Sequence, residues 1–324
     1  MISYKDPNKV NWFLVSWTLS NKCNYRCSYC PEHLHSGYTG QPEYTTVERF
    51  IKNFKVDKQI CYRISGGEPT YWKHFMNMAK LVKEQGHVFS FLTNGSQTVE
   101  YYKEISKYSD GIMLSYHPEY ADIKHIINIA NNVQSPIAMN LMMVQDKFDE
   151  LLELAEIIYN NTDNLAIWPK IVLDKSNADS ITNKPSEYSI EQLDIIQNWP
   201  YFRNLYTPQL HRGNILLDGN DISANELILN NLNRHHNWDC YGGLDMINID
   251  MWGNMYRSDC KNGGSIGNLE RYQLPNTTIK CMMESCNCLS DIYLRKDRPK
   301  FGADVQYIKS SDIVHSSSIL DKQG

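Results

Sequence analysis

Short apolar runs rich in β-branched and aromatic residues alternate with longer amphipathic runs from Phe13 to Val172. The short runs predict strands over Phe13–Leu19, Ile60–Ser65, Val88–Thr93, Gly111–Ser115, Ile137–Met143 and Ala166–Val172. The longer runs predict helices over Thr46–Phe54, Trp72–Gln85, Thr98–Tyr108, Ile123–Asn132 and Lys147–Tyr159. Strands and helices that alternate at this interval form βαβ units and a parallel sheet. Six such units are too few for a closed eight-unit TIM barrel, so the sequence predicts an α/β fold with a partial (β/α)6 TIM barrel.

Three cysteines follow the first predicted strand in the order Cys23-x3-Cys27-x2-Cys30. Because the loop follows a strand directly, we expect it at the carboxyl ends of the strands, where barrels of this kind have their active sites. Three thiolates on one short loop hold three irons of a four-iron cluster and leave the fourth iron open to a small molecule. The alternative is a structural zinc site, because His33 and His35 follow at a spacing that suits a Cys3His ligand set.

The second predicted strand ends in Ser65-Gly66-Gly67-Glu68-Pro69-Thr70. Two glycines let a ligand approach the backbone, and the proline biases Glu68 toward an extended conformation that fixes its carboxylate. Such a carboxylate suits an ammonium ligand held by a charge-assisted hydrogen bond. The alternative is a tight turn whose Glu68 is solvated.

The cysteine spacing and the Gly-Gly-Glu-Pro motif together resemble the radical S-adenosylmethionine (radical SAM) enzymes. The resemblance implies that the methionyl amine and carboxylate of SAM chelate the open iron of a 4Fe-4S cluster. It also implies that Gly66, Gly67 and Glu68 bind the amine of SAM, and that an electron from the cluster splits SAM into methionine and a 5′-deoxyadenosyl radical.

Four further residues resemble the lining of the SAM site in this family. Asn94 ends the third strand and Ser115 the fourth, Asn140 on the fifth strand would face the ribose, and Tyr29 beside the third cysteine would lie near adenine. Each has a structural alternative: Asn94 suits an Asn-Gly turn, and Ser115 and Asn140 suit a hydrogen-bonded barrel interior. His117 is a candidate proton donor, although a histidine paired with a backbone group is the commoner case.

A second group of cysteines lies near the other end of the chain. Cys240 precedes a predicted hairpin with its turn near Gly253, and the remaining members are Cys260, Cys281, Cys286 and Cys288. This order resembles the SPASM or twitch extension of radical SAM enzymes, which implies a small C-terminal α+β module with an auxiliary 4Fe-4S cluster. Five cysteines exceed the four that one cluster needs, and the sequence leaves open which of the last three is not a ligand. Zinc is the alternative here too. The adjacent His235 and His236 predict a solvated loop.

These landmarks divide the chain into four parts. We expect a barrel over residues 1–185, a connecting region over 186–235, the cluster module over 236–295 and a tail over 296–324. The barrel ends in the polar linker Asp174–Ser186, and the connecting region begins with a capped helix over Tyr188–Asn198 and contains a hairpin turn at Asp218-Gly219-Asn220.

Charge and composition limit the partners. A net charge of −5 and a pI near 6.1 give no general attraction to nucleic acid or to an anionic membrane. The N-terminus lacks an apolar stretch after a basic start, and no run of about 18 apolar residues occurs, so we expect a soluble cytoplasmic protein. Nine cysteines, including Cys61 within an apolar strand, fit metal ligation under reducing conditions better than disulfides.

Three functions follow from these motifs. The first is an oxidoreductase or another radical SAM enzyme that abstracts hydrogen from a small polar metabolite, such as a sugar or nucleotide derivative, with an electron donor such as flavodoxin or ferredoxin. The second is a radical SAM maturase that modifies a peptide; few residues precede the first strand to form a separate peptide-binding module. The third is a non-catalytic zinc adaptor. The motifs identify neither the substrate nor whether SAM is consumed or regenerated.

Overall fold

The computed structural model describes residues 2–4, 12–172, 188–203, 205, 215–222, 224–286 and 289–299. The predicted linker Asp174–Ser186, Cys288 and the tail beyond residue 299 lie outside these residues.

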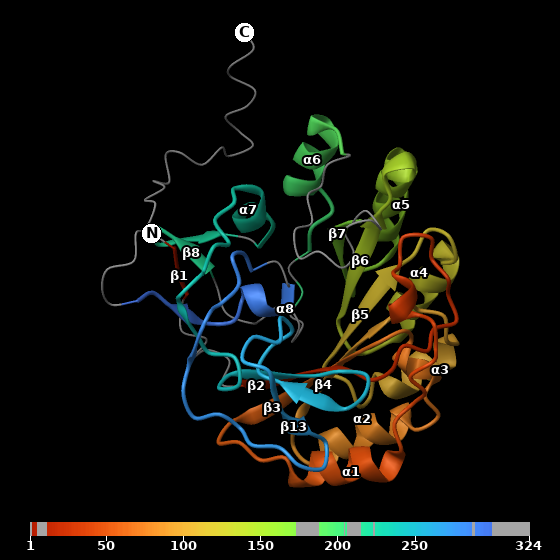
Figure 1. Cartoon of the computed structure of the whole chain (residues 1–324). Helices are drawn as coiled ribbons and strands as arrows, with labels where there is room; N and C mark the ends of the chain where they lie inside the picture. Colours follow the sequence, from red (N-terminus) through yellow and green to blue (C-terminus); the bar gives the residue numbers. More distant parts are fainter. Residues whose placement is uncertain are drawn as a thin grey trace.

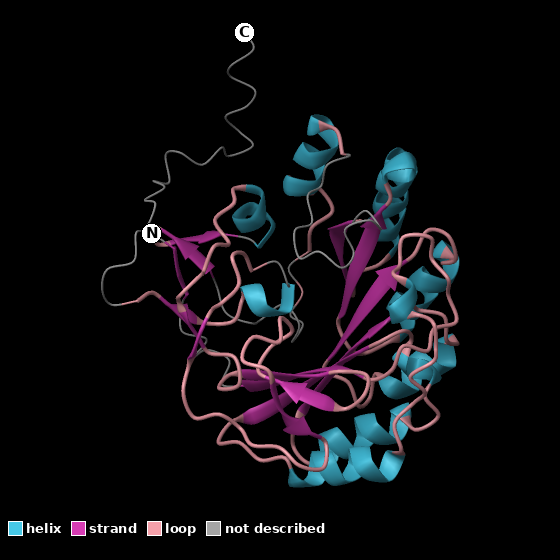
Figure 2. Cartoon of the chain, in the orientation of Figure 1, coloured by secondary structure: helices cyan, strands magenta, loops and turns pink. Residues whose placement is uncertain are grey.

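A curved sheet of parallel strands forms the centre of the molecule (Figure 1). Its six parallel strands in chain order are β2 Trp12–Thr18, β3 Gln59–Ser65, β4 Val88–Thr93, β5 Gly111–Tyr116, β6 Ile137–Met143 and β7 Leu165–Ile171. The helices between them are α1 Tyr44–Asn53, α2 Phe75–Glu84, α3 Val99–Ile105, α4 Ile123–Asn132 and α5 Phe148–Asn161. Figure 2 shows these helices on the outer side of the sheet. The predicted α/β partial barrel is confirmed, and every strand boundary agrees to within one residue.

Alternate strand residues pack between the sheet and its helices. Trp17 of β2 is 1% exposed and meets Phe50 of α1 edge to face with ring centroids 5.5 Å apart. Phe75 of α2 contacts Phe89 and Phe91 of β4 at 5.6 and 5.3 Å between centroids. Each large apolar side chain buried in this way stabilises the fold by about 1.5–3 kcal/mol, which is why the apolar periodicity of the sequence determines the barrel.

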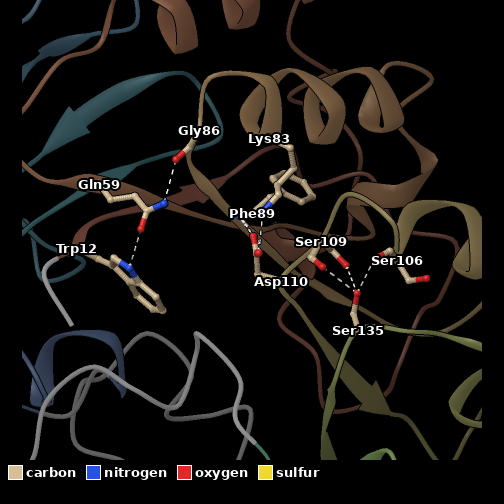
Figure 3. A network of polar contacts seen from close by, with 9 residues as sticks. All are labelled: Trp12, Gln59, Lys83, Gly86, Phe89, Ser106, Ser109, Asp110 and Ser135. Carbon is tan, nitrogen blue, oxygen red and sulfur yellow. Dashed lines mark hydrogen bonds and ion pairs between the residues drawn. The ribbon is translucent and has the colours of Figure 1, made fainter. Parts of the chain in front are cut away.

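Polar contacts tie the strands together where they begin (Figure 3). The Asp110 carboxylate accepts hydrogen bonds from the Lys83 ammonium at 2.6 Å and from the Phe89 amide at 2.8 Å. The Ser135 hydroxyl lies 2.9 Å from the carbonyl oxygen of Ser106 and 2.8 Å from that of Ser109. This end of the barrel is opposite the cysteine loop, so these contacts support the scaffold and leave the other end for chemistry.

The late hairpin joins the barrel sheet. It consists of β11 Met246–Ile249 and β12 Asn254–Tyr256, with the predicted turn near Gly253, and β13 Ser265–Asn268 follows. Strand β11 pairs with β2 in parallel, so the sheet has nine strands in the order β13-β12-β11-β2-β3-β4-β5-β6-β7. The amide of Leu14 donates to the carbonyl oxygen of Asp245 at 2.9 Å, and the Asp245 carboxylate pairs with Lys58 at 2.8 Å.

Two small antiparallel sheets complete the described part. In one, β1 Ile2–Tyr4 pairs with β8 Ile215–Leu217, which forms the predicted hairpin with β9 Asn220–Ile222. In the other, β10 Asp239–Cys240 lies between β14 Ile279–Lys280 and β15 Lys296–Asp297. The remaining helices are α6 Ile190–Gln197, which the sequence predicted, α7 Ala224–Leu229 and α8 Leu289–Ile292, and short 3-10 turns cover Glu32–Leu34, Pro69–Tyr71 and Gln145–Lys147. Among the helices described here, none has the length and apolarity to cross a bilayer.

Candidate functional site

The loop with the first three cysteines follows β2 directly. Cys27 is 5% exposed, and Cys23 and Cys30 are partly buried. The amide of Cys30 donates to the carbonyl oxygen of Cys27 at 3.0 Å, and the Arg26 guanidinium donates to the carbonyl oxygen of Cys23 at 2.7 Å. The loop therefore has a defined turn and lies at the carboxyl edge of the sheet, as predicted from sequence.

Gly66 and Gly67 hold the base of this loop. The Gly67 amide donates to the carbonyl oxygen of Ser20 at 2.9 Å. The amide of the next residue, Glu68, donates to the carbonyl oxygen of Lys22 at 2.8 Å. A Cβ on Gly66 would lie 2.4 Å from the Ser20 oxygen, and one on Gly67 would lie 2.4 Å from the Lys22 oxygen. Both positions therefore exclude any larger residue, because two backbone segments meet there.

The carboxylate of Glu68 lies beneath the loop and is fully buried. Its Oε1 accepts from the amide and hydroxyl of Thr70 at 3.1 and 2.6 Å and from the hydroxyl of Thr93 at 2.9 Å. Its Oε2 accepts from the Asn94 amide at 2.6 Å. Burial raises the pKa of Glu68 above its usual value, and these donors oppose that rise. The alternative of a solvated Glu68 is wrong, because the ends of two strands enclose it.

Asn94 joins Glu68 to the cysteine loop. Besides its amide bond to Glu68, its side-chain Nδ2 donates to Oδ1 of Asn24 at 2.8 Å and lies 3.9 Å from the Cys23 sulfur. Its Oδ1 accepts from the Ser96 amide at 3.1 Å, so Asn94 also forms the Asn-Gly turn of the structural alternative. Both roles fit one side chain.

The end of β5 holds the other side of the loop. The Glu119 carboxylate accepts from the amide of Ser28 at 3.0 and 2.9 Å and from its hydroxyl at 2.5 Å. The Tyr29 hydroxyl lies 2.8 Å from Nδ1 of His117, and the two rings stack. Burial lowers the pKa of His117 to about 4, so this imidazole is neutral at pH 7. Its partner is a tyrosine and not the backbone group that is commoner for histidine.

Ser115 and Asn140 lie apart from these contacts. They are direct neighbours across β5 and β6, and both are partly buried. Within the described residues neither side chain is hydrogen-bonded to the cysteine loop, so the structure brings them to the same sheet edge without joining them to Cys23.

The second cysteine group also gathers. Cys240 on β10 is the strand partner of Lys296 on β15 and lies near the sulfur of Cys281. Cys286 is close enough to Cys240 and Cys260 for their charges to interact. Backbone bonds fix two of these positions: the amide of Cys281 donates to Trp238 and that of Cys286 to Asn233, both at 2.8 Å.

Sequence patterns gave no indication of two charged residues beside this group, Asp291 and Lys296, each 3% exposed. The Asp291 carboxylate accepts from the amides of Asp259 and Cys260 at 3.1 and 2.9 Å. The Lys296 ammonium donates to the carbonyl oxygens of Asp291 and Leu294 at 2.6 and 2.8 Å. A charged residue in a polar stretch carries no sign of burial, so only the tertiary structure identifies these two.

The histidines of this region differ from each other. His236 is exposed, as predicted, but the prediction of a solvated His235 is wrong. His235 is fully buried, with its Nε2 2.9 Å from the hydroxyl of Tyr4. Burial is the main cause that lowers the pKa of His235 well below its usual value, so the ring packs as a neutral side chain.

The donor chemistry of both groups fits an iron-sulfur cluster. In the part of the chain that the structure describes, no three His, Cys, Asp or Glu side chains converge closely enough for a single metal ion. A cluster makes a different demand, because each thiolate binds its own iron and the sulfurs need not meet at one point. Buried thiols such as Cys27, whose pKa burial raises to about 12, would ionise only beside strong positive charge, which irons supply.

Comparisons with known proteins agree with this site. The profile described as the Radical SAM superfamily matches residues 17–135, which include the cysteine loop, the Gly-Gly-Glu-Pro motif and Asn94. A nucleotide dehydratase dependent on SAM, from Thermoplasmatales archaeon strain ISO4-H5, is 35% identical over 80 residues, 24% of this chain and 28% of its own. A GTP 3′,8-cyclase of Haemophilus influenzae is 21% identical over 179 residues, 52% of this chain and 49% of its own.

A solved structure shares the fold. SuiB of Streptococcus suis, bound to its precursor peptide SuiA, superposes with a TM-score of 0.53 at 14% identity, over 80% of this chain and 63% of SuiB. The chain spans at most about half the length of the two curated relatives, 28% of one and 49% of the other. The comparisons lead to one assignment for the first part of the barrel: residues 17–135 match the radical SAM superfamily.

Proposed function

We propose that the chain binds a 4Fe-4S cluster through Cys23, Cys27 and Cys30 and uses SAM to abstract hydrogen from a small nucleotide-type metabolite. The observation that carries the proposal is the direct link from the buried Glu68 through Asn94 to Cys23. This link fixes the cysteine loop against the motif whose counterpart binds SAM in related enzymes. When bound, the cluster and SAM supply a 5′-deoxyadenosyl radical, and the chain positions them.

The residues around the loop have separate parts in the proposal. Gly66 and Gly67 hold the loop base, which fixes the direction of the thiols. Within the described residues, Oε2 of Glu68 accepts one hydrogen bond, so it retains capacity for the methionyl ammonium of SAM. Tyr29, Ser115 and Asn140 are the proposed contacts for adenine and ribose, and Asn94 adds a polar contact beside the cluster.

A nucleotide-type substrate is supported by the names of the relatives, a nucleotide dehydratase and a GTP cyclase. The peptide alternative has only the fold of SuiB in its favour, and a shared fold does not name a substrate. We propose a flavodoxin or ferredoxin as the electron donor, because the reaction needs one electron at low potential.

We also propose an auxiliary 4Fe-4S cluster held by Cys240, Cys260, Cys281 and Cys286. The proximity of these four cysteines in the described structure supports this set.

The test is anaerobic reconstitution followed by incubation with dithionite and SAM. The wild type should form 5′-deoxyadenosine, and the variant with Cys23, Cys27 and Cys30 all changed to Ala should form none. Cys61→Ala is the matched control, because Cys61 is buried in β3 and belongs to neither cysteine group, so this variant should leave the product unchanged. Product from the triple variant at the wild-type rate would refute the cluster assignment.

A further inference from the structure

Strand β7 carries two polar side chains that the contacts above do not involve. Leu165, Ile167 and Ile171 belong to the apolar core that packs with the outer helices. Because side chains alternate along a strand, Trp168 and Lys170 belong to the opposite, inner face of the sheet. β7 is also the last strand in the sheet order, so this face lies where the curved sheet ends.

The indole of Trp168 has an unsatisfied donor. Its Nε1 is buried and has no hydrogen-bond partner among the described residues. The ring is fixed by an edge-to-face contact with Phe202, with centroids 5.2 Å apart at 85°. A buried N–H group without an acceptor costs free energy, so an acceptor that binds at this position would be stabilised by it.

Lys170 presents a second donor beside it. The side chain is partly buried, and among the described residues it makes no hydrogen bond or ion pair. Burial lowers the pKa of Lys170 to about 8, and no charge of the described residues contributes to that shift. The ammonium therefore lies in a poorly solvated position, and the part of the chain that the structure describes supplies no counter-charge for it.

The spacing of the two groups suits one anion. Two residues apart on one strand face, their Cα atoms are separated by about 7 Å, and the indole and ammonium both donate and cannot accept. Trp168 is also the direct strand neighbour of Asn140, which is a proposed SAM contact. An oxyanion held here would thus lie next to the proposed reaction site.

We propose that Trp168 and Lys170 form an anion-binding site for the phosphate group of the substrate. The identity of the anion rests on the proposed function, because the named relatives act on nucleotides. A phosphate offers several oxygens, so it can accept from the indole and the ammonium together.

Calorimetric titration of the reconstituted protein with inorganic triphosphate tests the site. The affinity should fall by about tenfold or more in Lys170→Met, by about threefold to tenfold in Trp168→Phe, and should be largely restored in Lys170→Arg. Lys103→Met is the matched control, because Lys103 is exposed on α3, and it should bind as the wild type does. Equal affinity in the wild type and Lys170→Met would overturn the proposal.

A second measurement needs no variant. Triphosphate should protect Lys170, and not Lys103, from acylation by acetic anhydride, with mass spectrometry of the peptides as the readout. Equal labelling of Lys170 with and without triphosphate would count against the site. If GTP binds more tightly than both guanosine and glucose 1-phosphate, the phosphate belongs to a nucleotide. If glucose 1-phosphate binds more tightly than GTP, it belongs to a sugar phosphate.

The failure of this site and that of the proposed function can be told apart. If the wild type cleaves SAM but neither binds triphosphate nor shows protection of Lys170, the anion site is wrong and the proposed function stands. If triphosphate binding depends on Lys170 and no SAM is cleaved, the site stands and the proposed function is wrong.

Discussion

At the scale of single residues, the carboxylate of Glu68 joins three segments that are distant in sequence. Thr70, Thr93 and Asn94 all donate to it, and none of it is exposed. One side chain therefore stabilises the ends of β3 and β4 and, through Asn94, the cysteine loop. Its structural and binding roles cannot be separated by position alone.

Glu68→Gln should weaken both folding and SAM binding. The new amide places an NH2 group opposite an existing donor, so the free energy of unfolding should fall by about 1–3 kcal/mol. The affinity for SAM should also fall, by about 1.5–3 kcal/mol, because a charge-assisted bond to its ammonium is lost. Denaturant unfolding and equilibrium binding of SAM measure the two effects. Glu100→Gln on the exposed face of α3 is the control, and unchanged values for Glu68→Gln would contradict both roles.

Lys170→Met should stabilise the protein without substrate, in a manner that depends on pH. The pKa of Lys170 falls from 10.5 to about 8 on folding, which corresponds to roughly 3 kcal/mol of destabilisation while the lysine is charged in both states. Between these two pKa values the unfolded chain binds more protons, so wild-type stability rises with pH there. The gain from Lys170→Met should thus be full below about pH 8 and absent above about pH 10.5. A gain that does not change over this range, measured by urea unfolding, would contradict the burial of this charge.

The sequence predicted which residues form this site, but it did not predict which other residues they contact. The sequence predicted Glu68 and Asn94 as site residues because each belongs to a short motif at the end of a strand. Two of the donors to Glu68, Thr93 and Asn94, lie at the end of another strand, and His235 is hydrogen-bonded to Tyr4, more than two hundred residues away. Local patterns carry no information on such partners.

At the scale of elements, the cysteine loop depends on close contact between two backbone segments. Gly67→Ala should reduce the iron bound after reconstitution and destabilise the fold, because its Cβ would meet the Lys22 carbonyl at 2.4 Å. Gly86→Ala is the matched control, since Gly86 has open space around it and tests only the strain of its positive φ of 76°. Iron analysis and thermal unfolding measure the result. Equal iron in both variants would show that the loop tolerates displacement.

Strand β15 brings a buried cation to the late cysteines. The buried ammonium of Lys296 lies close to Cys286 and Cys240, and Cys240 is its partner residue on the neighbouring strand. In a protein that already lacks Cys23, Cys27 and Cys30, we expect about four irons per chain from the proposed auxiliary cluster. When Lys296→Met is added to this variant, the iron content should fall, because the negatively charged cluster loses the buried ammonium of Lys296 as a counter-charge. Lys280→Met on the neighbouring strand, whose ammonium pairs with Asp239 at the surface, is the control. Zinc in place of iron would refute the auxiliary cluster.

At the scale of the whole molecule, the late cysteine segment and the barrel share one sheet. The alternating pattern predicted all six strands of the barrel, and turn residues predicted the hairpin at Gly253. The parallel pairing of β11 with β2 could not be predicted, because two apolar runs more than two hundred residues apart do not specify each other as partners. That pairing connects the proposed auxiliary cluster to the strand that leads into the first cysteine loop.

This shared sheet predicts that the hairpin unfolds together with the barrel. Ile247 and Ile249 of β11 are fully buried and belong to the same apolar core as Val15 and Trp17 of β2. Opening of β11 would therefore expose the edge of β2 and part of that core, so local opening should cost nearly as much free energy as global unfolding. Hydrogen exchange followed by mass spectrometry should show amides of residues 246–249 protected to the same extent as those of residues 13–17. Ile2–Tyr4 of β1, which pairs only with β8 in the described structure, provides the comparison and should exchange sooner. Early exchange of 246–249 at the rate of β1 would mean that the hairpin is an independent unit and that the first cysteine loop gains no support from it.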